Sequence, residues 1–197
     1  MRRIAKELGV GTMSLYWHVG NKEHLLDLML DAVAGEDQGA EPSGNWQEDL
    51  AEIARKERAS LLRHRWKPDV MAGRPPLGPN GLLHIERSLA SLDNLNIEPR
   101  IALYILATVM TYVTGSVLNE LSEINVEQQQ AKAGLTDDEI ETGMSDWTTN
   151  LHRSGLFPRL LRIFGAGIDP DSAETRDERF EFGLRCVLDG IATRLTL

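Results

Sequence analysis

The sequence of 197 residues lacks most short patterns that would indicate an enzyme. Its single cysteine, Cys186, excludes an internal disulfide bond and suits a reducing compartment. The patterns HExxH, CxxC, GxSxG and GxxxxGK[ST] are missing, and no two of the five histidines have the i, i+3 or i, i+4 spacing of a metal-binding pair. We therefore expect no cofactor, no metal and no catalytic residues. An enzyme whose groups meet only in the fold is the alternative that the sequence leaves open.

Positive charge and strand patterns are also scarce. The 21 basic residues against 30 acidic ones give a net charge of −9, which argues against diffuse nucleic-acid binding. Apolar residues recur at helical spacing and alternate nowhere as in strands, which predicts an all-α chain. Since no apolar leader with a cleavage site is present, we expect a cytoplasmic protein.

One stretch, residues 101–119, carries no charge at all. A membrane span needs about 20 such residues. Several hydroxyl residues and the lack of a flanking basic cluster favour instead a helix buried at the centre of a helical domain, without a membrane partner. Its threonines either line a cavity or bond back to the carbonyls of their own helix, and both alternatives remain open.

Residues 2–24, RRIAKELGVGTMSLYWHVGNKEH, are the most informative segment. They predict a short helix that ends at Gly9, then a second helix from which Leu15 and Val19 face inward. Asn21 is typical of the N-cap of a third helix. Two short helices joined by a glycine-marked turn predict a helix-turn-helix, whose second helix enters the DNA major groove.

The second helix of this motif exposes groups that suit a nucleic acid. Tyr16, Trp17 and His18 are consecutive and too large all to be core, so they need a partner. Aromatic, hydroxyl and basic side chains contact phosphates and base edges. Residues 1–24 have four basic and two acidic groups, net +2, whereas the other residues have 17 and 28, net −11. Because so small a basic patch makes few phosphate contacts, we expect a homodimer on a two-fold DNA operator.

The segment LGVGTMSLYWHVGNKEHLLDLMLDAV resembles the recognition-helix signature of TetR-type transcriptional repressors, and the resemblance covers about residues 1–34. It implies a set of side chains that face the groove: Thr12, Met13, Tyr16 and Trp17. It also implies a set that reaches the DNA backbone: Arg2, Ser14, Tyr16, His18 and Lys22. Arg2 would touch either the backbone or a base.

TetR-type proteins carry a further helix and a basic arm before this motif, and here neither precedes it. We expect the first helix to be missing, with Met1 an internal methionine or an artificial boundary. The apolar side chains of Ile4, Leu8, Leu15 and Leu25 would then lack part of their cover.

The remaining residues divide by composition. We expect an N-terminally incomplete helix-turn-helix domain at 1–34, a linker rich in Gly, Pro and acidic residues at 35–45, and a helical effector-binding and dimerisation domain at 46–197. The predicted architecture is thus a small helix-turn-helix domain and a larger helical domain, TetR-like.

We expect this larger domain to bind a small-molecule effector of moderate hydrophobicity, because its candidate cavity residues are mainly apolar with a few hydrogen-bonding groups. These residues are Met71, His84, Tyr104, Thr108, Thr111 and Trp147. A stripe such as the one that includes Trp147 is also typical of an ordinary core.

The last predicted helix, about 173–195, has a narrow face of small residues that suits a two-fold helical interface. The resemblance implies the same. The candidate interface residues are Gly183, Cys186, Val187, Gly190 and Ile191.

The expected function is therefore that of a bacterial, ligand-responsive, sequence-specific repressor that an effector releases from its operator. An alternative from another class is a dimeric helical small-molecule-binding protein whose incomplete DNA-binding segment is inert.

Overall fold

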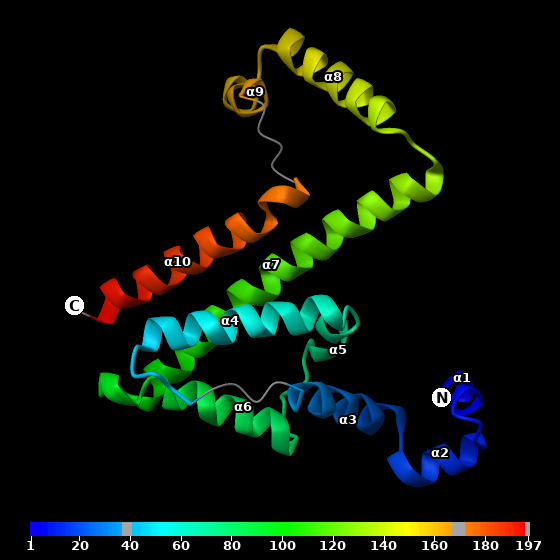
Figure 1. Ribbon diagram of the computed structural model, residues 1–197, viewed down its shortest axis with the longest axis vertical. Coiled ribbons are helices and arrows are strands. Elements are labelled where there is room, and N and C mark those ends of the chain that lie inside the picture. Colours follow the sequence, from blue (N-terminus) through cyan, green and yellow to red (C-terminus); the bar gives the residue numbers. More distant parts are fainter. Residues whose placement is uncertain (37–40, 167–171, 196–197) are drawn as a thin grey trace. The chain divides into compact units, whose positions relative to one another are not determined.

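The computed structural model describes residues 1–36, 41–166 and 172–195, and within these ranges every regular element is a helix. This confirms the all-α fold class (Figure 1). The helices are α1 (Arg2–Glu7), α2 (Thr12–Val19), α3 (Lys22–Ala34), α4 (Trp46–Arg63), α5 (Lys67–Met71), α6 (Pro79–Ala90), η1 (Asp93–Leu95), α7 (Pro99–Ala133), α8 (Asp137–Ser154), α9 (Pro158–Gly165), η2 (Ala173–Thr175) and α10 (Arg176–Leu195).

The chain forms two compact units. The first comprises Met1–Val117 with Gly183–Leu197, and the second comprises Leu118–Phe182. Residues 37–40 of the predicted linker lie outside the described residues, and α4 begins directly after that linker. The functional division at residues 34 and 46 stays a prediction.

The core of the first unit is built from apolar residues at helical spacing. In α4, Leu50, Ala54 and Leu61 are completely buried, and in α7 Val109 and Val113 are as well. Each of these sets recurs at intervals of three, four or seven residues, so one face of each helix carries it. Asn45 starts α4, since its side chain accepts a hydrogen bond from the amide of Glu48.

Helix α7 differs from its expected environment. The charge-free residues 101–119 were predicted to be buried on all sides, but Tyr104, Thr108 and Thr111 are exposed on the face opposite the buried valines. A lack of charge shows that no side of the helix is strongly hydrophilic. It does not determine how many sides of the helix are covered by other parts of the same chain. By length and composition α7 could cross a membrane, a test that core helices of soluble proteins also pass.

For Thr108, the structure distinguishes between a threonine that lines a cavity and one that bonds to its own helix. Thr108 Oγ1 donates a hydrogen bond to the carbonyl oxygen of Tyr104 at 2.7 Å, within the same helix. This threonine therefore satisfies its donor locally, as threonines in helices often do.

Residues 72–78 join the short helix α5 to α6, which begins at Pro79. Proline at the first helical position needs no amide partner, which makes Pro79 a suitable start. The side chain that satisfies the next amides comes from α3 and is described below.

In the second unit, the side chains of Thr136 and Glu139 define the start of α8. The Thr136 hydroxyl accepts from the amide of Glu139, and the Glu139 carboxylate accepts from the amide of Thr136, which completes a capping box. Helices α8 and α9 contact each other, and the rings of Trp147 and Phe164 meet edge to face with centroids 5.3 Å apart.

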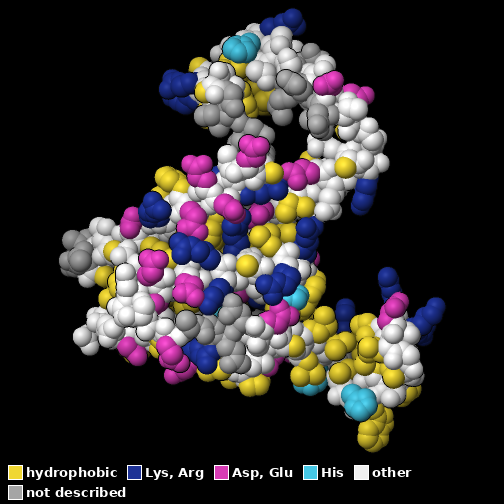
Figure 2. Space-filling view, in the orientation of Figure 1, with side chains coloured by type: hydrophobic (Ala, Val, Ile, Leu, Met, Phe, Trp, Pro, Cys, Tyr) yellow, Lys and Arg dark blue, Asp and Glu magenta, His cyan; other side chains and the backbone are white. Residues whose placement is uncertain are grey.

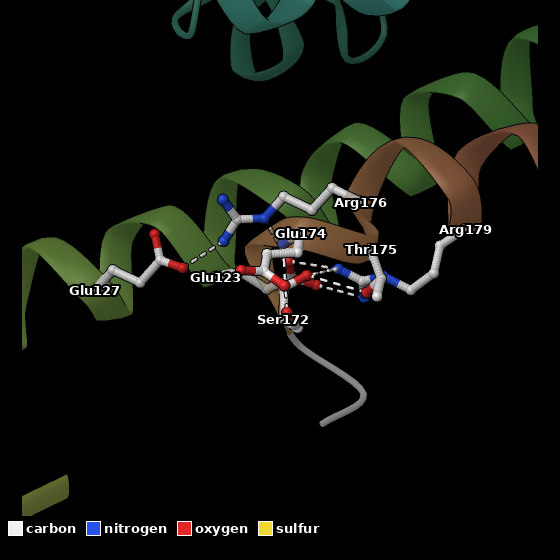
Figure 3. A network of polar contacts seen from close by, with 7 residues as sticks. All are labelled: Glu123, Glu127, Ser172, Glu174, Thr175, Arg176 and Arg179. Carbon is white, nitrogen blue, oxygen red and sulfur yellow. Dashed lines mark hydrogen bonds and ion pairs between the residues drawn. The ribbon is translucent and has the colours of Figure 1, made fainter. Parts of the chain in front are cut away.

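A network of ion pairs joins α7 to the start of α10 (Figure 3). Arg179 donates through Nη1 and Nη2 to the two carboxylate oxygens of Glu123, both at 2.9 Å. Arg176 donates through Nε to Glu123 at 2.9 Å and through Nη2 to Glu127 at 2.6 Å. The hydrogen bonds from Arg179, with those from Arg176, hold the pKa of the Glu123 carboxyl below its usual range.

This network makes the stability of the protein depend on pH. A depressed carboxyl pKa stabilises the folded state above the unfolded-state pKa, and the contribution is lost as pH falls through the folded-state pKa. Glu123→Gln is therefore expected to lower the free energy of unfolding near neutral pH, with a difference from wild type that shrinks in acid. Urea unfolding of both proteins at several pH values measures it. A difference that stays constant down to about pH 3 would contradict the assignment.

Candidate nucleic-acid interface

The turn between α1 and α2 forms where glycine was predicted to end the first helix. Gly9 has a φ of +65°, and its amide donates to the carbonyl of Lys6 while that of Val10 donates to the carbonyl of Ala5. This pair of bonds is a Schellman motif, which needs a residue with positive φ at the glycine position. The local sequence is thus sufficient to end α1 and begin α2.

A small apolar cluster fixes the angle between the two helices. Ala5 of α1 packs with Leu15 and Val19 of α2, and Met1 and Leu25 cover the cluster in part. The inward direction predicted for Leu15 and Val19 is confirmed. The apolar side chains of α1 outside this cluster remain exposed, with Ile4 at 39% and Leu8 at 62%.

The outer side of α2 presents large side chains to solvent. Trp17 is 89% exposed, Met13 75% and Tyr16 37%, and Figure 2 shows hydrophobic side chains gathered on the segment α1–α3 at lower right. Of the eight predicted DNA contacts only Thr12 is half-buried, and the others are exposed. Neither Thr12 nor Ser14 caps α2, because its N-cap is Gly11 and no side chain bonds there.

Helix α3 begins next to these side chains. The Asn21 side chain accepts from the amide of His24 at 2.8 Å, which confirms it as the N-cap. Lys22, a predicted phosphate contact, is then the first residue of α3, and Glu23 follows it.

A row of carboxylates lies along α3. Glu23, Asp27 and Asp31 are spaced four residues apart and so lie along one side of the helix. Arg74, which follows α5, pairs with the first two: its Nη1 donates to Asp27 Oδ1 at 3.0 Å and its Nη2 donates to Glu23. The motif is therefore tied to the turn between α5 and α6.

Asp31 supplies the missing cap of α6. Its Oδ1 accepts from the amides of Asn80 and Gly81, both at 2.9 Å, and the Asn80 side chain donates back to the Asp31 carbonyl at 3.1 Å. The N-cap position itself is Gly78, where an added Cβ would collide with the Asp31 carboxylate. The Gly-Pro-Asn sequence at 78–80 is a signal for a helix start, but the sequence does not show that the capping side chain lies 49 residues earlier.

The C-terminal end of α3 is joined to the end of α4. Glu36 accepts from His64 Nε2 at 2.8 Å and from Arg63 Nη1 at 3.2 Å. The hydrogen bond with His64 is the main cause that lowers the pKa of the Glu36 carboxyl. Sequence reasoning did not predict these contacts, since nothing local connects residues 36 and 64.

The candidate effector residues fall into different surroundings. Tyr104, Thr108 and Thr111 share the exposed side of α7, whereas Met71 and His84 are half-buried in the same unit. Trp147 belongs to the second unit, where it packs on Phe164.

The candidate interface residues of α10 also differ among themselves. Cys186 and Gly190 are exposed, and Val187 and Ile191 are half-buried. Gly183 has a role within the chain, because a Cβ there would collide with the ring of Tyr112 on α7. Among the described residues, no group of three His, Cys, Asp or Glu side chains could hold a metal ion.

Comparison with known proteins gives one family. The tetracyclin repressor-like C-terminal domain matches residues 38–195. The HTH-type transcriptional repressor DrrR1 of Streptomyces coeruleorubidus is 32% identical over 193 residues, which are 97% of this chain and 68% of that protein. The class A tetracycline repressor protein from transposon 1721 of Escherichia coli is 30% identical over 196 residues, 98% of this chain and 81% of that protein.

A solved structure supports the same relation. The Streptomyces coelicolor TetR family protein ActR in complex with actinorhodin aligns with a TM-score of 0.74 and 31% sequence identity, over 99% of this chain and 87% of that chain. The two relatives from the sequence comparison are both named as repressors.

Proposed function

The chain belongs to the TetR family of transcriptional regulators, and from this premise we propose that it is a sequence-specific DNA-binding repressor that a small molecule releases from its operator. The observation that carries the proposal is the exposed side of α2. Trp17, Met13 and Tyr16 stand on a helix whose other side is fixed by a buried cluster, so they form a preset surface for a DNA groove.

Charge supports duplex DNA as the partner of this surface. Among the proposed phosphate contacts, the two cations Arg2 and Lys22 lie on α1 and at the start of α3, the helices that precede and follow α2. The rest of the chain is strongly acidic. Because one such segment makes few phosphate contacts, two copies on one duplex are needed for useful affinity.

Homodimerisation is proposed through α7 and α10. The exposed side of α7 in the first unit carries small and apolar groups, including Tyr104, Thr111 and Gly115. The exposed side of α10 carries Cys186 and Gly190. Faces of this kind pack closely against a second copy around a two-fold axis, which also explains why so apolar a helix is left uncovered. Tyr104, Thr108 and Thr111 then belong to this interface rather than to a cavity.

The effector is proposed to be a moderately hydrophobic small molecule that binds the helical domain. The support is the relation to ActR, whose structure was solved with actinorhodin, together with the half-buried side chains of Met71 at the end of α5 and His84 in α6. The protein would act in the cytoplasm and would not be an enzyme. An effector shifts DNA binding only through unequal affinity for the DNA-bound and free conformations.

Duplexes selected from a random pool, followed by gel shifts, test DNA binding directly. We expect Tyr16→Ala and Lys22→Ala each to weaken binding to all sequences. Lys22→Ala is also expected to reduce the slope of log affinity against log salt by about one unit, because the lost cation no longer releases a counterion from the DNA. Glu52→Gln, on the exposed side of α4, is the control. Unchanged affinity of the Tyr16 variant, or an unchanged slope in the Lys22 variant, would contradict the contact assignment.

The exposed Ile4 and Leu8 favour a second candidate, a dimeric ligand-binding protein whose DNA-binding segment is inert. The two candidates differ in one measurement. No retardation of any selected duplex, combined with an actinorhodin-induced rise in melting temperature, would support the second.

A further inference from the structure

Arg74 lies outside the helix-turn-helix but bonds to it through two carboxylates. Its guanidinium donates to Asp27 at 3.0 Å and to Glu23, both on α3. The Arg74 side chain is 25% exposed, and those of Glu23 and Asp27 are 61% and 55% exposed. One cation thus offsets half of the charge of two solvent-facing carboxylates.

These carboxylates lie close to the proposed DNA contact of Lys22. Glu23 is the next residue, and Asp27 is one turn further on, about 6 Å along the helix axis. The Debye length is about 10 Å at 0.1 M ionic strength, so DNA phosphates held by Lys22 would experience both negative charges. Without a cation beside them, the start of α3 would repel the backbone that it is meant to bind.

We propose that Arg74 is a positioning residue for DNA binding, which acts by neutralising Glu23 and Asp27 rather than by touching DNA. The inference rests on the proposed function. It adds to the determinants of DNA binding a residue that follows α5, more than 50 positions after the recognition helix and absent from the helix-turn-helix signature.

A purely mechanical role of Arg74 makes a different prediction. If the guanidinium only tied α3 to the turn before α6, the weaker DNA binding caused by Arg74→Gln would persist when its carboxylate partners were also removed. If it neutralises them, removal of the carboxylates restores DNA binding although the tie is still broken. The Asp31 contacts to α6 remain in either case.

The test compares Arg74→Gln with the triple variant Arg74→Gln, Glu23→Gln, Asp27→Asn on a selected duplex at several salt concentrations. We expect Arg74→Gln to bind about threefold to tenfold more weakly at low salt, with a gap that closes as salt rises, and the triple variant to bind at least as tightly as wild type. The control Arg100→Gln removes the same charge and a similar surface pair, that with Glu98, and is expected to bind as wild type does.

The double variant Glu23→Gln, Asp27→Asn keeps Arg74 and is expected to bind more tightly than wild type, which tests the same idea even if Arg74→Gln unfolds. Thermal unfolding verifies that each variant is folded. Unchanged binding by Arg74→Gln, or weak DNA binding that persists in the triple variant, would overturn this inference but not the proposed function. If the wild-type chain bound no duplex, the proposed function would fall, and the inference with it.

Discussion

Replacement of Lys67 by methionine is expected to lower the free energy of unfolding by about 3 to 5 kcal/mol, the cost of leaving one member of a buried ion pair without its partner. Lys67 Nζ donates to both carboxylate oxygens of Glu57 at 2.9 Å and to Ser60 Oγ at 3.1 Å. The two charged side chains are only 8% and 13% exposed. Methionine fills similar space, so the loss reflects charge and hydrogen bonding rather than a cavity.

The matched control removes both charges. The double variant Lys67→Met, Glu57→Leu is expected to recover most of the lost stability, because a buried pair replaced by apolar side chains is often close to neutral. Urea unfolding at neutral pH gives both values. A Lys67→Met protein within about 1 kcal/mol of wild type would show that Glu57 reaches water when unpaired.

Substitution of Gly78 by alanine is expected to cost about 2 kcal/mol or more, because the new Cβ would collide with the Asp31 carboxylate and displace it from the two amides of α6. Asp31→Ala removes the same cap without a collision and is expected to cost about 2 kcal/mol. Both effects are measured as shifts in the urea midpoint at unchanged slope.

Gly11→Ala is the matched control for this prediction. Gly11 and Gly78 are both N-cap residues with extended backbone, at φ −69° and −71°, yet nothing lies within 4 Å of a Cβ built on Gly11. Its substitution is therefore expected to cost about 1 kcal/mol at most, because alanine is a poorer N-cap than glycine but meets no neighbour here. Equal losses at the two positions would mean that α6 tolerates movement of Asp31.

The features that were predictable from the sequence are those that neighbouring residues determine. Gly9 ends α1, Asn21 caps α3, and Thr136 with Glu139 caps α8, each through bonds that span at most a few residues. The exposed side of α2 also follows from local spacing, once Leu15 and Val19 are assigned to the inside. Sequence reasoning therefore located the helix-turn-helix and its family signature.

The contacts that escaped prediction join distant residues. Arg74 meets α3 across about 50 positions, and Glu36 meets His64 across 28. Charged residues of this kind are indistinguishable in sequence from those on a solvated surface. The prediction that α7 is buried on all sides was wrong for a related reason. Periodicity identifies its buried valines but does not reveal what covers the opposite side.

The cap that α3 provides for α6 has a consequence for protein engineering. Because Asp31 on α3 caps the first turn of α6, the helix-turn-helix segment cannot be exchanged on its own. A chimera that exchanges residues 1–36 with those of a relative would place a foreign side chain opposite Gly78 and Asn80. Such an exchange needs residues 74–81 from the same donor, so that both halves of the joint come from one parent.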